Sequence, residues 1–156
     1  LAQCVSDPDI VQFDRRAGVF RDEAGVREKF GVEPESIPDW LGLVGDTADG
    51  FPGLAGWGAK SAAAVLSRYR HIEDIPLNPG QWDITVRGGA KLCATLAEHF
   101  EDALLFRRIA TLEFDVEVGT PADWRWTGPD AGFAEMCALL DAGDVAAKLA
   151  RLAAAR

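Results

Sequence analysis

Apolar positions along the chain mostly follow the period of a helix. They recur three or four residues apart between turn-forming residues, which places them on one face of each helix. The segment 59–69, for example, aligns Ala62, Val65 and Leu66. Helices are therefore expected at 23–30, 36–44, 59–69, 90–100, 102–111, 131–140 and 144–154, with a helical turn at 72–75.

Two parts of the chain follow a different pattern. Short β-prone runs at 10–13 and 19–20 flank a turn, so a small hairpin is expected there. Residues 113–118 alternate apolar and acidic side chains, which predicts a strand or an extended segment. Residues 120–129 are rich in Pro, Gly and Trp and are expected to form a surface loop, with Trp124-Arg125-Trp126 as a candidate partner-binding edge.

Composition sets the class of protein. Hydrophobic residues make up 48% of the 156 residues, so the chain can bury one core with an appended extension. Cys4, Cys93 and Cys137 lack the spacing of zinc or redox motifs and are expected to be reduced thiols. No run reaches the roughly 18 apolar residues of a membrane span, so a soluble, cytoplasmic protein is expected. Since Leu1 is not Met and no signal sequence follows, the numbering is expected to open inside a longer protein.

The net charge of −9 argues against a nucleic-acid partner, but the charges are unevenly distributed. Residues 31–59 contain no Lys or Arg, whereas residues 52–72 contain no Asp or Glu. The basic block carries Lys60, Arg68 and Arg70. Composition alone favours ordinary charge scatter on solvated faces.

Asp46 and Asp49 are candidate metal ligands. Their spacing places both carboxylates on the same side of a helix end. Mg²⁺ and Mn²⁺ bind carboxylate oxygens, and Mg²⁺ keeps several waters beside one or two protein carboxylates. The alternative is that these two aspartates only cap and turn the chain beside the neighbouring glycines.

The glycine-rich segment that follows predicts a phosphate-binding hairpin. Gly53, Gly56 and Gly58 allow tight turns and close approach of backbone N–H groups to an anion, and a helix N-terminus follows directly. Lys60, beside Ser61, adds a positive charge there. The spacing differs from that of a nucleotide-binding P-loop. A tight helix connection without any ligand is the alternative.

Other polar residues are weaker candidates. Arg68 and Arg70, and Arg87 with Lys91, extend a phosphate track or are solvated charges. The two histidines have no partner at motif spacing and are expected to be surface or capping residues; they are His71 and His99. The pair Arg107-Arg108 is expected to face solvent, and the five Trp are expected to be mostly core.

The two candidate signals are contiguous and form one pattern. It is Gly45-Asp46-x-x-Asp49-x-x-Pro52-Gly53-x-x-Gly56-x-Gly58-x-Lys60-Ser61-Ala62. This pattern resembles the helix-hairpin-helix segment of bacterial 5′-3′ exonucleases, including the 5′-nuclease domain of family A DNA polymerases. Residues 1–30 and 87–118 are similar to the elements on either side of that segment, and nothing is carried over beyond Gly119.

The resemblance implies a fold and a division of the chain. The fold is mainly α, a helix-hairpin-helix (SAM-like) domain preceded by the last strand and helix of an α/β PIN-like nuclease core. The core remnant would be residues 1–35, the DNA-binding domain 36–118, and a C-terminal loop with helices 119–156. Trp57 departs from the small aliphatic residue usual in the family, which implies different packing or a surface that stacks against DNA.

The resemblance also implies a site. Asp46 and Asp49 would bind Mg²⁺ or Mn²⁺ at one of two metal positions, and the other acids would lie before Leu1. The hairpin would hold DNA backbone through Gly53, Gly56, Gly58, Lys60 and Ser61, extended by Arg68, with K⁺ bound by hairpin carbonyls.

The implied function is that of the C-terminal part of a metal-dependent 5′-3′ exonuclease or flap endonuclease. Its partners would be DNA with a 5′ flap, nick or branch, and a DNA polymerase. Since two-metal hydrolysis needs a shared set of acids, the chain is expected to bind DNA without efficient cleavage. The alternatives are a freestanding helix-hairpin-helix adaptor and a protein-interaction domain.

Overall fold

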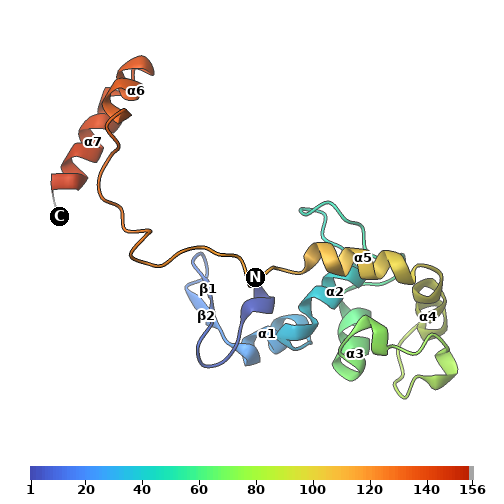
Figure 1. Cartoon of the computed structure of the whole chain (residues 1–156). Helices are drawn as coiled ribbons and strands as arrows, with labels where there is room; N and C mark the ends of the chain where they lie inside the picture. The colour runs from blue at the N-terminus through green and yellow to red at the C-terminus, as the bar shows by residue number, and fades with distance from the viewer. Residues whose placement is uncertain (155–156) are drawn as a thin grey trace. The chain divides into compact units, whose positions relative to one another are not determined.

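The computed structural model describes residues 1–154 and divides into two compact units (Figure 1). The first unit is Leu1–Glu113, and the second begins at Phe114. The described chain is mainly helical, which confirms the predicted fold class. The functional division of the chain after residues 35 and 118 stays a prediction.

The first unit opens with a short 3-10 turn and a β-hairpin. The turn η1 spans Ala2–Cys4, and strands β1 (Gln12–Asp14) and β2 (Val19–Arg21) pair antiparallel. Asp14 fixes the connection, because its Oδ1 accepts hydrogen bonds from the N–H groups of Arg16 and Ala17 at 3.1 and 3.0 Å. The predicted hairpin is thus confirmed.

Helix α1 spans Glu23–Phe30 and has the local signals of a short helix at both ends. Asp22 caps its start by accepting a hydrogen bond from the N–H of Gly25 at 2.8 Å. Gly31 ends it with a φ of 74°, and a Cβ there would come within 2.8 Å of the Cβ of Ala63. Glycine at this position therefore lets α1 end close against the next helical layer.

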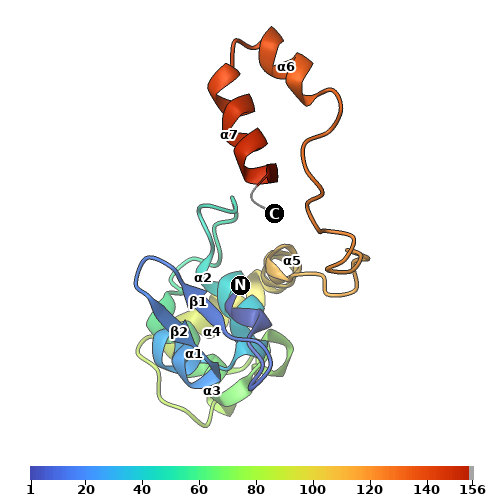
Figure 2. The ribbon, with the colours of Figure 1, turned by 90° about the vertical axis from the view of Figure 1, so that its left-hand side faces the viewer.

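The rest of the first unit is a helical body. Its elements are η2 (Pro34–Ser36), α2 (Ile37–Val44), α3 (Ala59–Tyr69), η3 (Ile72–Asp74), η4 (Pro79–Gln81), α4 (Gly89–Glu98) and α5 (Phe100–Ala110). Helices α2 and α5 lie side by side (Figure 1, Figure 2). Gly42 makes this possible, because a Cβ there would lie 3.0 Å from the carbonyl oxygen of Ala103 on α5.

One hydrophobic core joins these helices. Its largest fully buried apolar side chains come from α1, α2, α3, η3 and α4: Val26, Leu43, Val65, Leu66, Ile72, Cys93 and Leu96. Burial of such side chains contributes on the order of 1.5–3 kcal/mol each. The core fixes the two ends of the glycine-rich segment 45–58, which connects α2 to α3.

An ion cluster forms around one buried carboxylate in this body. Asp39 on α2 is 2% exposed, and its Oδ1 accepts hydrogen bonds from the N–H of Ile72 at 3.0 Å and from Arg107 at 3.2 Å. Its Oδ2 lies 3.0 Å from Nδ1 of His71, and Arg107 also pairs with Glu73. The expectation that Arg107 faces solvent is wrong, because the buried Asp39 carboxylate requires a partner.

The second unit contains two helices, α6 (Phe133–Leu139) and α7 (Gly143–Ala154). For 113–118 the prediction is a strand or an extended segment, and the structure excludes the strand. Within the described chain this segment pairs with no strand. Its apolar side chains are exposed: Phe114 by 69%, Val116 by 59% and Val118 by 61%. An alternating pattern forms a strand only where a neighbouring strand accepts its hydrogen bonds. Across residues 1–154, no helix combines the length and apolar character of a membrane span.

Candidate nucleic-acid interface and metal ligands

A pair of glycines closes the base of the loop after α2. Gly45 and Gly53 have φ values of 86° and 68° and lie against each other. A Cβ on Gly53 would lie 2.3 Å from the N of Gly45, and a Cβ on Gly45 would lie 2.4 Å from the carbonyl oxygen of Pro52. The N–H of Leu54 donates to the carbonyl of Leu43 at 2.8 Å. Only glycine fits both positions, so the loop has a fixed entry and exit.

Asp46 and Asp49 lie within this closed loop and not on a helix, which corrects the predicted placement. Helix α2 ends at Val44, and the N–H of Asp46 donates to the carbonyl of Phe51 at 3.0 Å. Oδ1 of Asp46 accepts hydrogen bonds from the N–H groups of Ala48 at 2.9 Å and Asp49 at 3.4 Å. The Asp46 side chain thus shapes the turn with one oxygen.

The oxygen chemistry of this turn fits a hard divalent cation, but the donor set is small. Asp46 is half-buried and Asp49 is exposed, and both are carboxylates. In the described part of the chain, no group of three or more His, Cys, Asp or Glu side chains is placed to hold a metal ion. Two carboxylates are what Mg²⁺ often takes from a protein, with water completing its six ligands. The assignment of both aspartates as metal ligands stays a prediction.

Trp57 anchors the hairpin to the body of the protein. It is 6% exposed, and its Nε1 donates a hydrogen bond to the carbonyl of Leu92 on α4 at 3.2 Å. Its ring centroid lies 6.5 Å from that of Trp82. Of the two interpretations of Trp57, different packing or a surface that stacks against DNA, the buried ring contradicts the second. The exposed part of the hairpin is its small residues, Ala55 and Gly56.

The hairpin leads directly into the N-terminus of α3. Gly58 is the N-cap, and Oγ of Ser61 accepts a hydrogen bond from its N–H and donates one to its carbonyl, both at 3.0 Å. The Ser61 hydroxyl is thus occupied by the cap. Lys60 is exposed, and within the described residues it forms no ion pair. The exposed helix N-terminus and this free ammonium group favour an anion.

A groove runs beside the hairpin. Its volume is about 570 Å³, and three segments contribute to it: the hairpin, the first turns of α3 and the loop before α4. Its lining residues are Gly56, Gly58, Ala59, Lys60, Ser61, Ala64, Thr85, Val86 and Arg87. The lining is small, uncharged or basic, which suits a phosphate-bearing chain.

Two of the candidate cations are neutralised within the protein. Arg68 donates to Oδ2 of Asp83 from Nε at 2.8 Å and from a terminal nitrogen at 2.5 Å. This contact raises the pKa of Arg68 and lowers that of Asp83. Arg70 donates to Glu35 at 2.6 Å. The role of Arg68 in DNA binding stays a prediction, and a phosphate would have to compete with Asp83.

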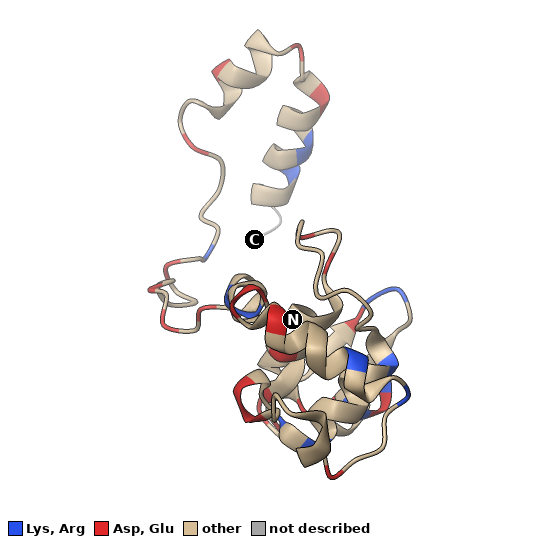
Figure 3. Cartoon of the chain, turned by 90° about the vertical axis from the view of Figure 1, so that its right-hand side faces the viewer, with Lys and Arg blue, Asp and Glu red and all other residues tan. Residues whose placement is uncertain are grey.

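The charged residues of the first unit are distributed over many of its helices and loops. Figure 3 shows Lys and Arg positions spread over several helices and loops and not gathered in one stripe. At the hairpin, positive potential comes from backbone N–H groups and from the exposed Lys60 and Arg87.

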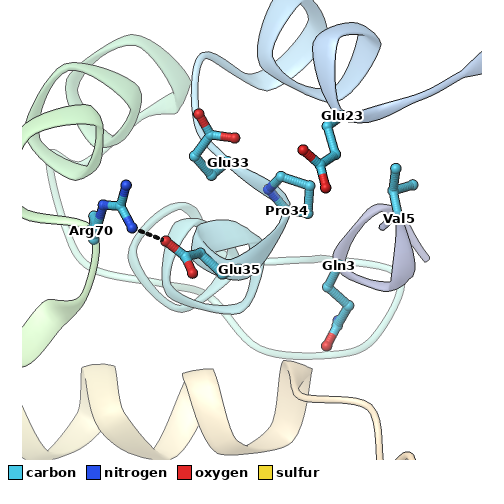
Figure 4. A pocket seen from close by; sticks show the side chains of 7 residues that line it. All are labelled: Gln3, Val5, Glu23, Glu33, Pro34, Glu35 and Arg70. Carbon is cyan, nitrogen blue, oxygen red and sulfur yellow. Dashed lines mark hydrogen bonds and ion pairs between the residues drawn. The ribbon is translucent and has the colours of Figure 1, made fainter. Parts of the chain in front are cut away.

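A second hollow, of about 350 Å³, has the opposite character (Figure 4). Three glutamates face it: Glu23, Glu33 and Glu35. Glu35 is paired with Arg70, and Glu33 binds Arg27 at 2.8 Å. These contacts tie the segments around η2 together, so the hollow is part of the framework of the protein.

Comparison with known proteins places this hairpin in a family context. The family model described as "5'-3' exonuclease, C-terminal SAM fold" matches residues 32–132. A DNA polymerase I of Pseudomonas aeruginosa is 35% identical over 136 residues, which covers 82% of this chain and 14% of the relative. A flap endonuclease Xni of Vibrio parahaemolyticus is 34% identical over 110 residues, or 70% of this chain and 40% of the relative.

A 5'-3' exonuclease of Aquifex aeolicus is 44% identical over 78 residues, which covers 50% of this chain and 27% of the relative. The chain therefore spans well under half the length of these curated relatives. The family match includes the whole of the closed loop, the hairpin and the groove.

Proposed function

We propose, because this chain belongs to the 5′-3′ exonuclease C-terminal SAM-fold family, that it binds branched duplex DNA through its hairpin. The observation that carries the proposal is the exposed hairpin with a free Lys60 at the first turn of α3. Backbone N–H groups and a lysine ammonium group bind phosphate without reading the bases. The preferred substrate is DNA with a 5′ flap, a nick or a branch, and the name flap endonuclease of one relative supports the flap.

The first test is the affinity for a fluorescently labelled 5′-flap duplex, measured by anisotropy in low salt with Mg²⁺. Lys60→Ala removes one phosphate contact, so the affinity is expected to fall about tenfold, equivalent to about 1.4 kcal/mol. Lys29→Ala is the matched control, because Lys29 lies over the ring of Phe30 and lines a different hollow, formed by β2 and α1. Absence of binding by the unaltered protein would overturn the proposal and favour the protein-interaction alternative.

The second part of the proposal concerns the two aspartates. Asp46 and Asp49 would bind one Mg²⁺ or Mn²⁺ ion, which when bound supplies a Lewis acid for phosphodiester hydrolysis. Asp46→Asn keeps an oxygen that can accept the hydrogen bonds of the turn, so the loop fold is preserved while a negative charge is lost. A Mn²⁺ titration followed by water proton relaxation should show weaker binding by both Asp→Asn variants. Equal binding by all three proteins would contradict the assignment.

The chain as given is proposed to bind DNA with little cleavage, because a two-metal centre needs more acids than these two. Robust flap cutting by residues 1–156 alone, free of contaminating nuclease, would refute this. If the α/β half of a relative restores cleavage in trans, Asp46→Asn is expected to abolish the restored activity. A freestanding adaptor would gain no activity from that addition. A DNA polymerase is proposed as a partner, since three relatives carry the name DNA polymerase I.

A K⁺ ion bound by the hairpin carbonyls is the last element of the proposal. Its support is the tight hairpin, in which Gly53 and Gly56 have φ values of 68° and 85°. Flap DNA should bind more weakly when Na⁺ replaces K⁺ at constant ionic strength. Equal affinity in the two salts would remove K⁺ from the site.

A further inference from the structure

The groove beside the hairpin has two walls, and only one of them belongs to the hairpin motif. Gly56, Gly58 and Lys60 form the first wall. The second wall is the loop before α4, at Thr85–Arg87, more than 20 residues further along the chain. A Cβ on Gly58 would meet nothing within 4 Å, so the backbone there faces open space.

The loop that forms the second wall is fixed by contacts with other residues of the first unit. Nε1 of Trp82 donates to the carbonyl of Pro76 at 2.7 Å, and its ring packs 6.5 Å from that of Trp57. The hydroxyl of Tyr69 donates to Asp83 at 2.9 Å. The turn ends where the N–H of Gly89 donates to the carbonyl of Val86 at 2.9 Å. Because both walls are attached to the same aromatic cluster, the separation between them is set by the core.

The charged residues that line the groove are all positive. Arg68, Arg70 and Arg107 are each paired with a carboxylate. Lys60 and Arg87 are exposed, and within residues 1–154 neither takes part in an ion pair. No Asp or Glu is among the lining residues. Two free cations thus face one groove in a protein whose net charge is −9.

We infer that Arg87 is a second phosphate-binding residue and that the groove holds the sugar-phosphate backbone of one DNA strand between Lys60 and Arg87. The inference rests on the proposed DNA binding and adds a residue outside the hairpin to it. The small side chains that line the groove leave room for the deoxyribose rings of the strand. The guanidinium group of Arg87 can donate two hydrogen bonds to a phosphate. The loop 82–88 then fixes which phosphates lie beside the hairpin.

The test is the salt dependence of affinity for the flap duplex, measured by anisotropy from roughly 50 to 300 mM KCl. Each phosphate neutralised by the protein adds about 0.9 to the slope of log affinity against log salt. Arg87→Ala and Lys60→Ala should each lower the slope by about 0.9, and the double variant by about 1.8. Arg87→Lys keeps the charge, so it should keep the slope while binding more weakly.

Arg108→Ala is the matched control, because Arg108 is exposed on α5 and paired with Glu113 at 3.0 Å. Its slope should equal that of the unaltered protein. A full slope for Arg87→Ala, with a reduced slope for Lys60→Ala, would overturn the role of Arg87 and leave the proposed function intact. Failure of the unaltered protein to bind would refute both. Within residues 1–154, the Arg87 side chain is exposed and takes part in no ion pair, so its variants should keep the unaltered urea midpoint.

Discussion

Replacing Gly53 by alanine tests whether the closed loop depends on contact between two backbones. The new Cβ would lie 2.3 Å from the N of Gly45, 2.4 Å from the carbonyl carbon of Val44 and 2.7 Å from the carbonyl oxygen of Leu43. A side chain at a φ of 68° costs about 1–2 kcal/mol. Forcing the packed backbone apart adds about 1–3 kcal/mol. The expected loss of unfolding free energy is therefore about 2–5 kcal/mol.

Gly50→Ala is a matched control in the same loop. Gly50 also has a positive φ, 86°, but a Cβ there would meet nothing within 4 Å. Only the conformational cost of about 1–2 kcal/mol applies. Both substitutions reduce the entropy of the unfolded chain by the same amount, so that effect cancels between them.

Urea denaturation followed by tryptophan fluorescence measures both free energies of unfolding. Gly53→Ala should be less stable than Gly50→Ala by about 1–3 kcal/mol with the same denaturant slope. Gly53→Ala should also weaken the binding of flap DNA, because Gly53 is the first residue of the hairpin. If the two variants agree within about 0.5 kcal/mol, contact between the backbones does not hold the loop, and the reasoning from the glycine pair is refuted.

Three further predictions concern the framework around the site. Asp39→Ala should lower the free energy of unfolding by about 3 kcal/mol in urea, because it removes the buried carboxylate that binds the N–H of Ile72 and the guanidinium group of Arg107; a loss below about 1 kcal/mol would mean that the cluster is not structural. The Arg107 contact holds the pKa of Glu73 below its ordinary value of 4.5, so its stabilisation is present above that pH and is lost as the pH falls through the lowered pKa. Glu73→Gln should thus cost under about 1 kcal/mol at pH 7 and nothing in strong acid, and a pH-independent difference would contradict this. Trp57→Phe should cost about 1 kcal/mol through the lost bond to Leu92 and leave DNA affinity unchanged, whereas a large loss of affinity would restore a stacking role.

Local signals in the sequence determined most of the helices. Asp22 and Gly31 mark the two ends of α1, and the apolar spacing within 59–69 matches the bounds of α3. These signals act between residues at most four positions apart, so they survive without knowledge of the fold. The exception is 113–118, where the pattern is local but the hydrogen-bond partners of a strand are not.

The sequence predicted which residues could form the site, and the tertiary structure decided which of them are free to bind a phosphate. Ion pairs form between distant parts of the chain: Arg68 pairs with Asp83 15 residues away, and Arg107 with Asp39 68 residues away. No sequence pattern showed that these arginines are neutralised while Arg87 is not. The same holds for Trp57, whose burial depends on α4.

The sequence by itself therefore determined the mainly helical fold, the glycine-rich hairpin and the resemblance to 5′-3′ exonucleases, because each follows from residues close together in the chain. Only the tertiary structure decided that Gly45 and Gly53 lie back to back and that Lys60 and Arg87 face one groove. Both depend on how α2, α3 and the loop before α4 pack, and packing is set by contacts between residues far apart in the sequence.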